Sequence, residues 1–296
     1  MILAPLRGVT IRCFREVFAE QLREAGFTEA ITPFISALAG CDPLKSDELG
    51  GGAPPGLRLT PQFIGKDPAA LRACLTRVRE AGYETADLNC GCPFPMVRNK
   101  GRGSGILRTP DVLRRMLEVG CEVMGPGRFS IKARLGVDRT DELLALMPMI
   151  NGFPLRFITV HARTARQMYG GVCDWRAFDA VCAAAKVPIV RNGDIPFPPP
   201  QTASLLMVGR SFIRDLGERE GIGELLSRYI GASAAELCGD RPVLGRLKEL
   251  IAYWKELPAW RVRWQVIKIC RSIGELEAAV QGSDRPIKRP IDNRKI

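Results

Sequence analysis

The sequence predicts an α/β protein in which a (β/α)8 TIM barrel is followed by a C-terminal all-helical domain. Eight short apolar or β-branched segments alternate with amphipathic segments over the first 214 residues. A Rossmann sheet is disfavoured, because no GxGxxG loop joins an early strand to a helix. Beyond Arg214 the strand pattern stops and helical segments follow one another. We therefore expect a barrel domain over residues 1–214 and a helical domain over residues 215–282.

The composition narrows the class of protein. A chain of 296 residues that is 46% hydrophobic is expected to bury a substantial core. Ten cysteines, with no signal peptide and no long apolar span, indicate free thiols, a cytoplasmic location and no membrane contact. The formal net charge of +11 favours an anionic partner such as nucleic acid, although a basic proteome would produce the same excess.

The predicted strands are short, and the first begins at residue 2 with no leader before it. Each is an apolar or β-branched run of the kind found in a buried parallel sheet. The eight segments cover residues 2–7, 29–37, 57–65, 85–90, 129–136, 156–163, 188–195 and 204–212.

Capping signals locate the helices that follow the first strands. Thr10 precedes apolar residues at helical spacing, which predicts a helix over residues 11–22 with Thr10 as its N-cap. Asp67 as N-cap, a proline directly after it and Gly82 at the end predict a second helix. The same signature predicts a further helix over residues 109–120.

The last connection of the barrel is irregular. Residues 196–203 are too few and too proline-rich for a full helix, so the seventh helix is expected to be truncated to a turn. Residues 283–296 are polar and basic and are expected to form a loosely held tail. From the charge pattern alone, the basic residues of the last helices are a solvated face. These residues are Arg261, Arg263, Lys268 and Arg271, and the same region also contains Arg246, Lys248 and Lys255.

Polar residues follow most of the predicted strands, at the end of the barrel where this class of fold has its chemistry. Glycines at the ends of strands seven and eight allow backbone N–H groups to approach a phosphate, with Arg210 beside them. This pattern predicts a phosphorylated cofactor or substrate. The polar and glycine residues at these ends are Gln62, Asn89, Cys92, Lys132, Arg134, His161, Arg163, Asn192, Gly193, Asp194, Gly209 and Arg210.

Two cysteines end the fourth predicted strand, in LNCGCPFPMVRNKGRGSG at residues 88–105. Cys92 is either a packed core thiol or a functional group, and the flanking glycine and proline favour the functional interpretation. A metal site on Cys90 and Cys92 is disfavoured, because the chain has no CxxC and a single histidine. We therefore expect no metal.

Seven motifs occur here in the order in which they occur in tRNA-dihydrouridine synthases, and the chain resembles this family. The resemblance covers roughly the first 215 residues, and the cysteine motif is its most specific element. GRLKELIAYWKEL, followed by an arginine-rich helix, is similar to the C-terminal helical domain of the bacterial C-type branch. The motifs are APLRGVT, PQFIG, DLNCGCP, IKARLG, TVHARTA, RNGDI and MVGR.

The resemblance implies FMN in the barrel mouth, NADPH as reductant, and reduction of a uridine in tRNA to 5,6-dihydrouridine. It implies that Gln62 contacts the pyrimidine edge of the flavin and that His161 lies close to flavin and substrate. Lys132 would lie beside N1 and C2, where its charge would stabilise the anionic reduced flavin. The remaining residues implied to bind FMN are Pro5, Asn192, Gly193, Asp194, Gly209 and Arg210.

The resemblance also implies a role for the Cys92 thiol. Hydride would pass from flavin N5 to uracil C6, and Cys92 would protonate C5 as a general acid. A thiol with a pKa of about 8.5 is still protonated at neutral pH, as an acid must be. The residues implied to bind the substrate are Asn89, Arg134 and Arg163.

Membership of this family would change the interpretation of the basic segments. The RNKGRGSG loop at residues 98–105 lacks the helix and the Ser/Thr spacing of a P-loop, and is expected to be a mobile loop that faces RNA. The basic residues of the C-terminal helices would contact tRNA. The C-type branch implies position 16 in the D-loop, and we expect a monomer.

Two departures from the family pattern stand out. Pro33 occupies a position where family members usually carry an acidic residue, and the seventh connection is short.

Two other functions stay open. One is an FMN barrel that reduces a small molecule, as dihydroorotate and ene reductases do, and the other is an RNA-binding flavoprotein without turnover. The helical extension and the positive charge favour the tRNA reductase over the small-molecule reductase.

Overall fold

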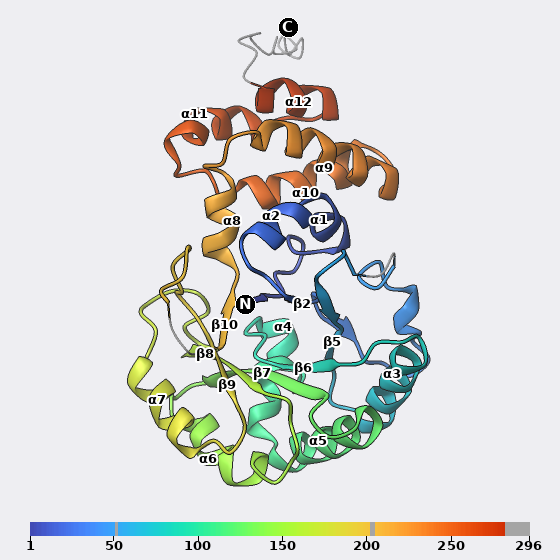
Figure 1. Cartoon of the computed structure of the whole chain (residues 1–296), viewed down its shortest axis with the longest axis vertical. Coiled ribbons are helices and arrows are strands. Elements are labelled where there is room, and N and C mark those ends of the chain that lie inside the picture. The colour runs from blue at the N-terminus through green and yellow to red at the C-terminus, as the bar shows by residue number, and fades with distance from the viewer. Residues whose placement is uncertain (51–52, 202–204, 282–296) are drawn as a thin grey trace, which may run out of the picture. The chain divides into compact units, whose positions relative to one another are not determined.

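The short apolar segments of the first 212 residues form the strands of a closed parallel barrel with helices outside it (Figure 1). The computed structural model describes residues 1–50, 53–201 and 205–281, and it confirms the predicted TIM barrel. The strands are β1 (Ile2–Leu3), β2 (Glu29–Ile31), β3 (Ile35–Ser36), β4 (Arg58–Thr60), β5 (Gln62–Ile64), β6 (Ala86–Cys90), β7 (Phe129–Gly136), β8 (Ile158–Thr164), β9 (Ile189–Asn192) and β10 (Leu205–Val208).

Two of the predicted strands are bent, and their halves close the barrel. The second is divided at Pro33 into β2 and β3, and the third is divided at Pro61 into β4 and β5. Proline interrupts a strand ladder because it has no N–H. β2 pairs with β4 and β3 with β5, so the ring stays continuous across both bends. The hydroxyl of Thr32 accepts a hydrogen bond from the Gln62 N–H at 3.0 Å, which joins the two bends.

Helices and short turns connect the strands around the outside of the barrel (Figure 1). Among them, α6 and α7 lie in segments for which the sequence patterns predicted no specific bounds. The helices are α1 (Arg12–Val17), α2 (Ala19–Glu24), α3 (Pro68–Glu80), α4 (Pro95–Arg98), α5 (Pro110–Met124), α6 (Glu142–Ile150), α7 (Trp175–Ala184) and α8 (Arg210–Leu216), and the 3-10 turns are η1 (Pro43–Lys45) and η2 (Gly103–Arg108).

The first helix differs from its prediction. The structure has two short helices, α1 and α2, which are separated at Phe18. Thr10 does not cap α1. Its hydroxyl accepts from the Leu6 N–H at 2.8 Å and donates to the Ala4 carbonyl at 3.0 Å. Thr10 therefore stabilises the loop after β1, where a helix N-cap was expected.

The next two helices follow their capping signals in part. Asp67 caps α3 as predicted, by accepting from the N–H groups of Ala69 and Ala70. Helix α5 begins after Thr109 but continues past Gly120 to Met124. Gly120 is not a helix end, because its missing side chain makes room for Phe129: an added Cβ would lie 2.0 Å from the ring.

The seventh helix was expected to be truncated, and the described part of this connection agrees with the expectation. The described residues between β9 and β10, 193–201, contain no helix. They contain four prolines, three of them consecutive at residues 198–200, and a cis peptide bond between Phe197 and Pro198. Helix α8 then follows β10 directly.

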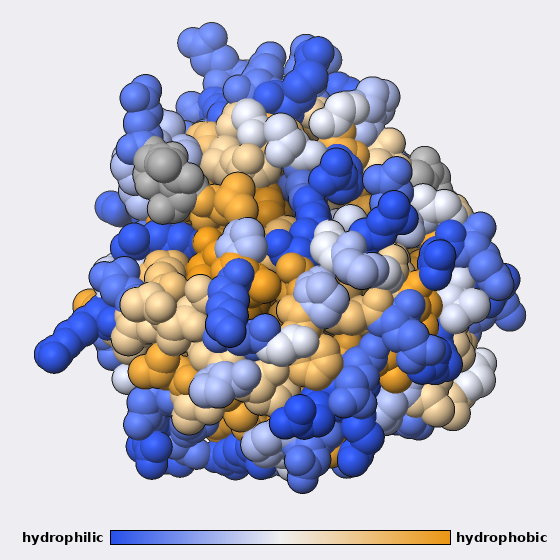
Figure 2. All heavy atoms as spheres, turned by 60° about the horizontal axis from the view of Figure 1, so that its bottom comes forward, coloured by the Kyte–Doolittle hydropathy of each residue, from blue (hydrophilic) through white to orange (hydrophobic). Residues whose placement is uncertain are grey.

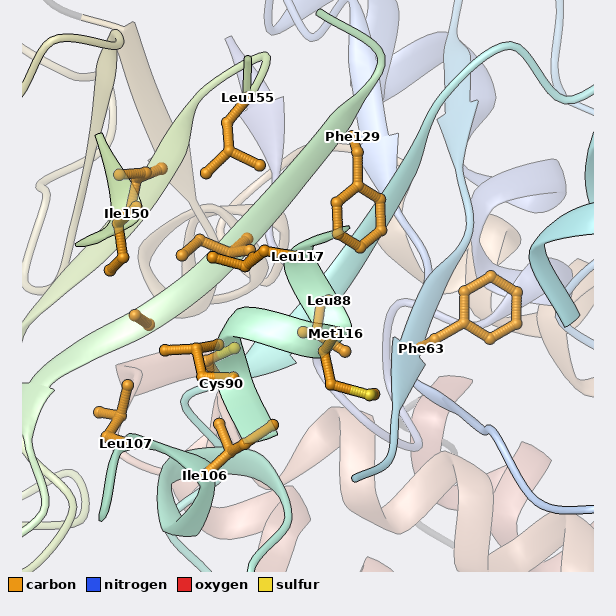
Figure 3. Packing of buried hydrophobic residues seen from close by; sticks show 14 of the residues in the cluster. Phe63, Leu88, Cys90, Ile106, Leu107, Met116, Leu117, Phe129, Ile150 and Leu155 are labelled. Carbon is orange, nitrogen blue, oxygen red and sulfur yellow. The ribbon is translucent and has the colours of Figure 1, made fainter. Parts of the chain in front are cut away.

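The two faces of the barrel strands differ in polarity. Leu88, Cys90 and Ile131 point outward into a large apolar cluster with the helices, part of which is shown in Figure 3. Their neighbours in the chain point into the barrel, where a second, smaller apolar cluster fills one side. The other side is polar, and at one end Glu29 of β2 forms two hydrogen bonds with Arg156, at 2.6 and 2.7 Å, across the interior. The second cluster contains Ile2, Ala4, Ile31, Phe157, Val190 and Met207.

The residues from Ile213 onward form a second compact unit of helices, α9 (Ile222–Glu236), α10 (Asp240–Ile251), α11 (Pro258–Ile267) and α12 (Ile273–Gln281). Trp254 and Trp260 are buried in contact with each other, with ring centroids 4.8 Å apart. Their indole N–H groups donate to the carbonyls of Ile213 and Gly217, at 2.6 and 2.8 Å. The predicted basic tail lies outside the described residues.

Charged side chains of the outer helices face solvent. On α5, for example, Arg114 and Arg115 are exposed while Leu113 and Met116 are buried. Hydrophilic residues form much of the edge of the face shown in Figure 2, with apolar residues between them. In the part of the chain that the structure describes, no helix combines the length and the apolar character needed to cross a membrane.

The packing at Gly120 predicts a stability effect. Gly120→Ala places a Cβ against the buried Phe129 ring, and overpacking of this kind costs about 1–3 kcal/mol of unfolding free energy. Gly245→Ala is the control, because Gly245 is exposed within α10 and an added Cβ would contact nothing. There alanine should stabilise the helix by about 0.5–1 kcal/mol. Thermal unfolding followed by circular dichroism measures both, and equal midpoints for the two variants would contradict the packing argument.

Candidate active site

A chain of hydrogen bonds leads from the barrel interior to Cys92. Gln62 Nε2 donates to the buried Asp87 carboxylate at 2.7 Å. Gln62 Oε1 accepts from Asn89 Nδ2 at 2.8 Å. Asn89 Oδ1 in turn accepts from the backbone N–H groups of Gly91 and Cys92, at 3.1 and 2.8 Å. Side chains from two neighbouring strands, β5 and β6, therefore hold the turn that carries the thiol.

The Cys92 side chain is buried beneath the turn η2. The backbone carbonyl of Cys92 accepts hydrogen bonds from both the N–H and the hydroxyl of Ser104, at 3.1 and 2.9 Å. Gly103 has a φ of +56°, and an added Cβ would lie 2.7 Å from the Cβ of Cys92, so the close approach requires glycine. Burial raises the pKa of the Cys92 thiol, although the Phe94 N–H and Arg134 oppose this effect. The thiol is therefore protonated at neutral pH.

The RNKGRGSG loop was expected to be mobile, and this expectation is wrong for its second half. Residues 103–107 are buried within η2, and an added Cβ at Gly105 would lie 2.1 Å from the Arg98 carbonyl oxygen. The glycines thus serve close packing around Cys92. Lys100 is exposed, and Arg98 and Arg102 are partly exposed, so the cationic part of the loop does face solvent.

Lys132 and Asn192 meet inside the barrel mouth, although their strands, β7 and β9, are not neighbours. Lys132 Nζ donates to Asn192 Oδ1 at 2.9 Å, and Asn192 Nδ2 donates to the Met207 carbonyl at 2.9 Å. Asn192 therefore ties the ammonium group to β10. The implied contact of Asn192 with a phosphate stays a prediction.

Arg163 is fully engaged within the protein. Its guanidinium pairs with the Asp194 carboxylate and also donates to the carbonyls of Gly170 and Gly171. Nη1 lies 3.3 Å from His161 Nε2, and because arginine only donates, the neutral imidazole carries its proton on Nδ1. The structure thus places Arg163 where it orients its neighbours, and its implied contact with substrate stays a prediction.

Tyr169 is a member of the site that sequence reasoning missed. Its ring lies between Arg134 and Arg210, whose guanidinium carbons are 5.3 and 5.0 Å from the ring centroid. Arg134 also donates to the Gly91 carbonyl at 3.0 Å and to the Met168 carbonyl at 2.6 Å. An aromatic residue before a glycine pair, in the loop after a strand that ends in His and Arg, was the available signal.

The glycines at the last strands serve packing as well as access. Gly193 has a φ of +145°, and an added Cβ would lie 2.7 Å from Cys173 Sγ. A Cβ at Gly209 would lie 2.9 Å from the Cβ of Ala4 in the segment after β1. Pro5, directly after Ala4, is partly exposed at the same end of the barrel as Gly209 and Arg210.

The cations of the mouth repel one another. Burial and Arg134 lower the pKa of Lys132 to about 7, and Arg210 contributes in the same direction. Burial lowers the pKa of Arg134 to about 10, with contributions from Arg163 and Arg210. Burial, Lys132 and the arginines also lower the pKa of His161, which keeps the imidazole neutral. Asp194 compensates part of this charge by pairing with Arg210 as well as with Arg163. The remaining positive charge suits an anionic ligand.

The lowered pKa of Lys132 predicts how stability depends on pH in ligand-free protein. Between about pH 7 and 10.5 the unfolded chain holds a proton on Lys132 that the folded chain has released, so stability rises with pH. This residue contributes at most about 1.4 kcal/mol per pH unit. Lys132→Met removes the contribution, so the variant should gain more stability relative to wild type at pH 6 than at pH 9. Urea unfolding at both pH values measures the difference, with the exposed Lys66→Met as control.

The family model "Dihydrouridine synthase (Dus)" matches residues 2–207. A probable tRNA-dihydrouridine synthase of Rhodobacter capsulatus is 32% identical over 201 residues, which is 66% of this chain and 60% of the relative. tRNA-dihydrouridine synthase B of Vibrio cholerae is 29% identical, covering 71% and 66%. tRNA-dihydrouridine(16) synthase of Escherichia coli K12 is 28% identical, covering 66% and 64%.

Solved structures support the fold. The old yellow enzyme homologue from Zymomonas mobilis has a TM-score of 0.53 at 13% identity, over 72% of this chain and 85% of that chain. Morphinone reductase has a TM-score of 0.50 at 12% identity, over 72% and 82%. The match to the curated relatives spans 60–66% of their own lengths. Because the family model covers residues 2–207, which include the DLNCGCP motif, Lys132 and Arg134, the chain belongs to the dihydrouridine synthase family.

Proposed function

We propose that this protein reduces a uridine of tRNA to 5,6-dihydrouridine, with FMN bound at the barrel mouth and NADPH as the reductant. The observation that carries the proposal is the juxtaposition of a buried, protonated Cys92 thiol with the excess positive charge of Lys132, Arg134 and Arg210. Family membership supplies the reaction class, and relatives described as tRNA-dihydrouridine synthases support tRNA as the substrate. We also propose that the protein belongs to the C-type branch and reduces the uridine at position 16 of the D-loop. We propose further that it is a cytoplasmic monomer, in which the barrel binds FMN and the helical domain recognises tRNA.

The residues of the mouth fit FMN by their chemistry. FMN carries a phosphate and a ring system that becomes anionic on reduction, and it would supply hydride to the uracil ring. The guanidinium of Arg210, beside the glycines of β9 and β10, would hold the phosphate. Lys132 would lie at the anionic edge of the ring, where the bound charge raises its pKa and favours the protonated ammonium. Asp194 acts through Arg210, which it orients. Pro5, Gln62, His161, Asn192 and the two glycines complete the proposed FMN contacts.

Cys92 has the properties of a proton donor. Burial keeps its thiol protonated, and the bonds from Ser104 and Asn89 fix its backbone. Arg134 lies close enough to lower the pKa of the thiol, so it would stabilise the thiolate that remains after the proton moves to C5 of the uracil. Asn89, Arg134 and Arg163 are the proposed residues for uracil binding and orientation.

The helical unit supports a second contact with RNA. Of the basic residues predicted there, several are engaged within the unit: Arg246 pairs with Glu236, and Lys248 donates to the carbonyls of Lys268 and Cys270. Arg263 donates to the Val280 carbonyl. By contrast, the side chains of Lys255, Arg261, Lys268 and Arg271 are exposed. These exposed cations are the better candidates for phosphate contacts.

The first test of this function is Cys92→Ala. Loss of a general acid costs about 10²–10⁴-fold in rate, so the variant should form little dihydrouridine while it retains FMN and is still reduced by NADPH. Nucleoside mass spectrometry of tRNA incubated with each protein measures the product, and absorbance measures the flavin. Cys90→Ala is the control, because Cys90 lies in the outer apolar cluster. Equal losses of dihydrouridine formation in both variants would mean that Cys92 is not the proton donor. A protein unable to bind FMN would overturn the proposed function.

The second test concerns the helical unit. Replacing Lys255, Arg261 and Arg271 by Gln should weaken tRNA binding and reduce the log–log salt slope by roughly 0.7–0.9 for each lost phosphate contact. FMN content and NADPH oxidation should not change. The matched control replaces three exposed arginines on the outside of the barrel, Arg114, Arg115 and Arg128. Wild-type affinity and slope in the helical variant would remove this unit from RNA recognition and favour a small-molecule reductase.

A further inference from the structure

We propose that Asp87 is a positioning residue that holds the amide groups of Gln62 and Asn89 in the one orientation that binds the turn of Cys92. Asp87 is fully buried inside the barrel, two residues before Asn89 on β6. Asp87 is the first residue of the DLNCGCP motif, and the chemistry described above gives it no role.

The direction of each hydrogen bond in the chain supports this role. An ionised carboxylate only accepts, so the NH2 group of Gln62 must face Asp87. The oxygen of Gln62 then faces Asn89 and accepts from its NH2 group. That leaves the oxygen of Asn89 toward the backbone N–H groups of Gly91 and Cys92, which only donate. The Asp87 carboxylate at one end and the two backbone N–H groups at the other therefore both require the same orientation of the Gln62 and Asn89 amides.

The surroundings of Asp87 keep it ionised near neutral pH. Burial raises its pKa to about 6, while the hydrogen bonds from Ser130 and Gln62 and the charge of Lys132 lower it and Glu29 raises it. Ser130 Oγ donates to Asp87 Oδ1 at 2.6 Å, so both carboxylate oxygens have a partner. The carboxylate is therefore fixed on one side by Ser130 and on the other by Gln62.

The proposal rests on the proposed function only in assigning proton transfer to the Cys92 thiol. The effect of Asp87 on the turn of Cys92 can be measured in the absence of any reaction. The variants Asp87→Asn and Asp87→Leu have nearly the same shape and both remove the buried charge. Asparagine keeps an acceptor for Gln62 and can donate to Ser130, whereas leucine offers neither. A merely structural role for the buried charge predicts the same behaviour in both variants, and a positioning role separates them.

Amide hydrogen exchange of Gly91 and Cys92 in the full chain, followed by NMR, is the direct readout. In Asp87→Leu both amides should exchange about tenfold faster than in wild type, because the chain of bonds that holds them has lost its anchor. In Asp87→Asn they should stay within about twofold of wild type. Thr159→Val is the control, because Thr159 is buried in the same barrel interior and its hydroxyl has no partner among the described residues. In Thr159→Val, the amide exchange rates of Gly91 and Cys92 should match those of the wild type.

Activity provides the second readout. Asp87→Leu should lower kcat for dihydrouridine formation about tenfold, and Asp87→Asn should restore kcat. Equal exchange rates in the asparagine and leucine variants, or wild-type protection in Asp87→Leu, would overturn the proposal. If Asp87→Leu does not fold, Gln62→Leu cuts the same chain at its next member and should give the same loss of protection. A wild-type protein that makes no dihydrouridine would overturn the function and leave the exchange test intact.

Discussion

The barrel depends on the requirement that polar side chains in its interior pair inside the protein, a requirement that the Thr159 hydroxyl does not meet among the described residues. Water is excluded there, and an unpaired buried donor or acceptor costs about 1–3 kcal/mol. Glu29 meets this requirement by reaching across the interior to Arg156 and by accepting from Thr60 at 2.7 Å. Thr60 shares a further hydrogen bond with Thr85 at 2.7 Å, and Asp87 is the next interior residue along β6. Two sets of hydrogen bonds therefore lie side by side in the interior: one joins Glu29, Thr60 and Thr85, and the other leads from Asp87 to the turn of Cys92.

This interior also separates charge along the barrel axis. The Asp87 carboxylate lies toward the N-terminal ends of the strands, where Arg156 compensates the charge of Glu29, while Lys132, Arg134 and Arg210 lie toward the C-terminal ends. In a medium of low dielectric constant such a separation is not screened, so it acts on whatever occupies the mouth. It favours an anion over a neutral ligand, and it adds to burial, the larger cause, in lowering the pKa of His161. Flavin phosphate, reduced flavin and an RNA substrate are all anionic, so one field serves the proposed cofactor and the proposed substrate.

Sequence reasoning predicted the order of strands and the residues at their ends, because both follow from local patterns of apolar residues and caps. It missed features that depend on contacts distant in the chain. Pro33 and Pro61 divide strands that the apolar pattern shows as continuous, and Gly120 resembles a helix end until Phe129 is placed against it. Asp87 lies in an apolar run, where its hydrogen-bond partners on neighbouring strands are invisible to periodicity. Tyr169 was missed because a loop after a strand has no period at all.

The tryptophans give the two units different optical signatures. Trp254, Trp260 and Trp264 lie in the helical unit, and Trp175 is the single tryptophan of the barrel. The indoles of Trp254 and Trp260 are shielded from water and hydrogen-bonded to backbone carbonyls, a setting in which emission is blue-shifted, whereas Trp175 is only partly buried beneath the Arg191 guanidinium, 3.8 Å from its ring centroid. Intrinsic fluorescence thus reports mainly on the helical unit. The proposed flavin would add a visible absorption band that reports on the barrel, so the two units could be followed at separate wavelengths in one sample.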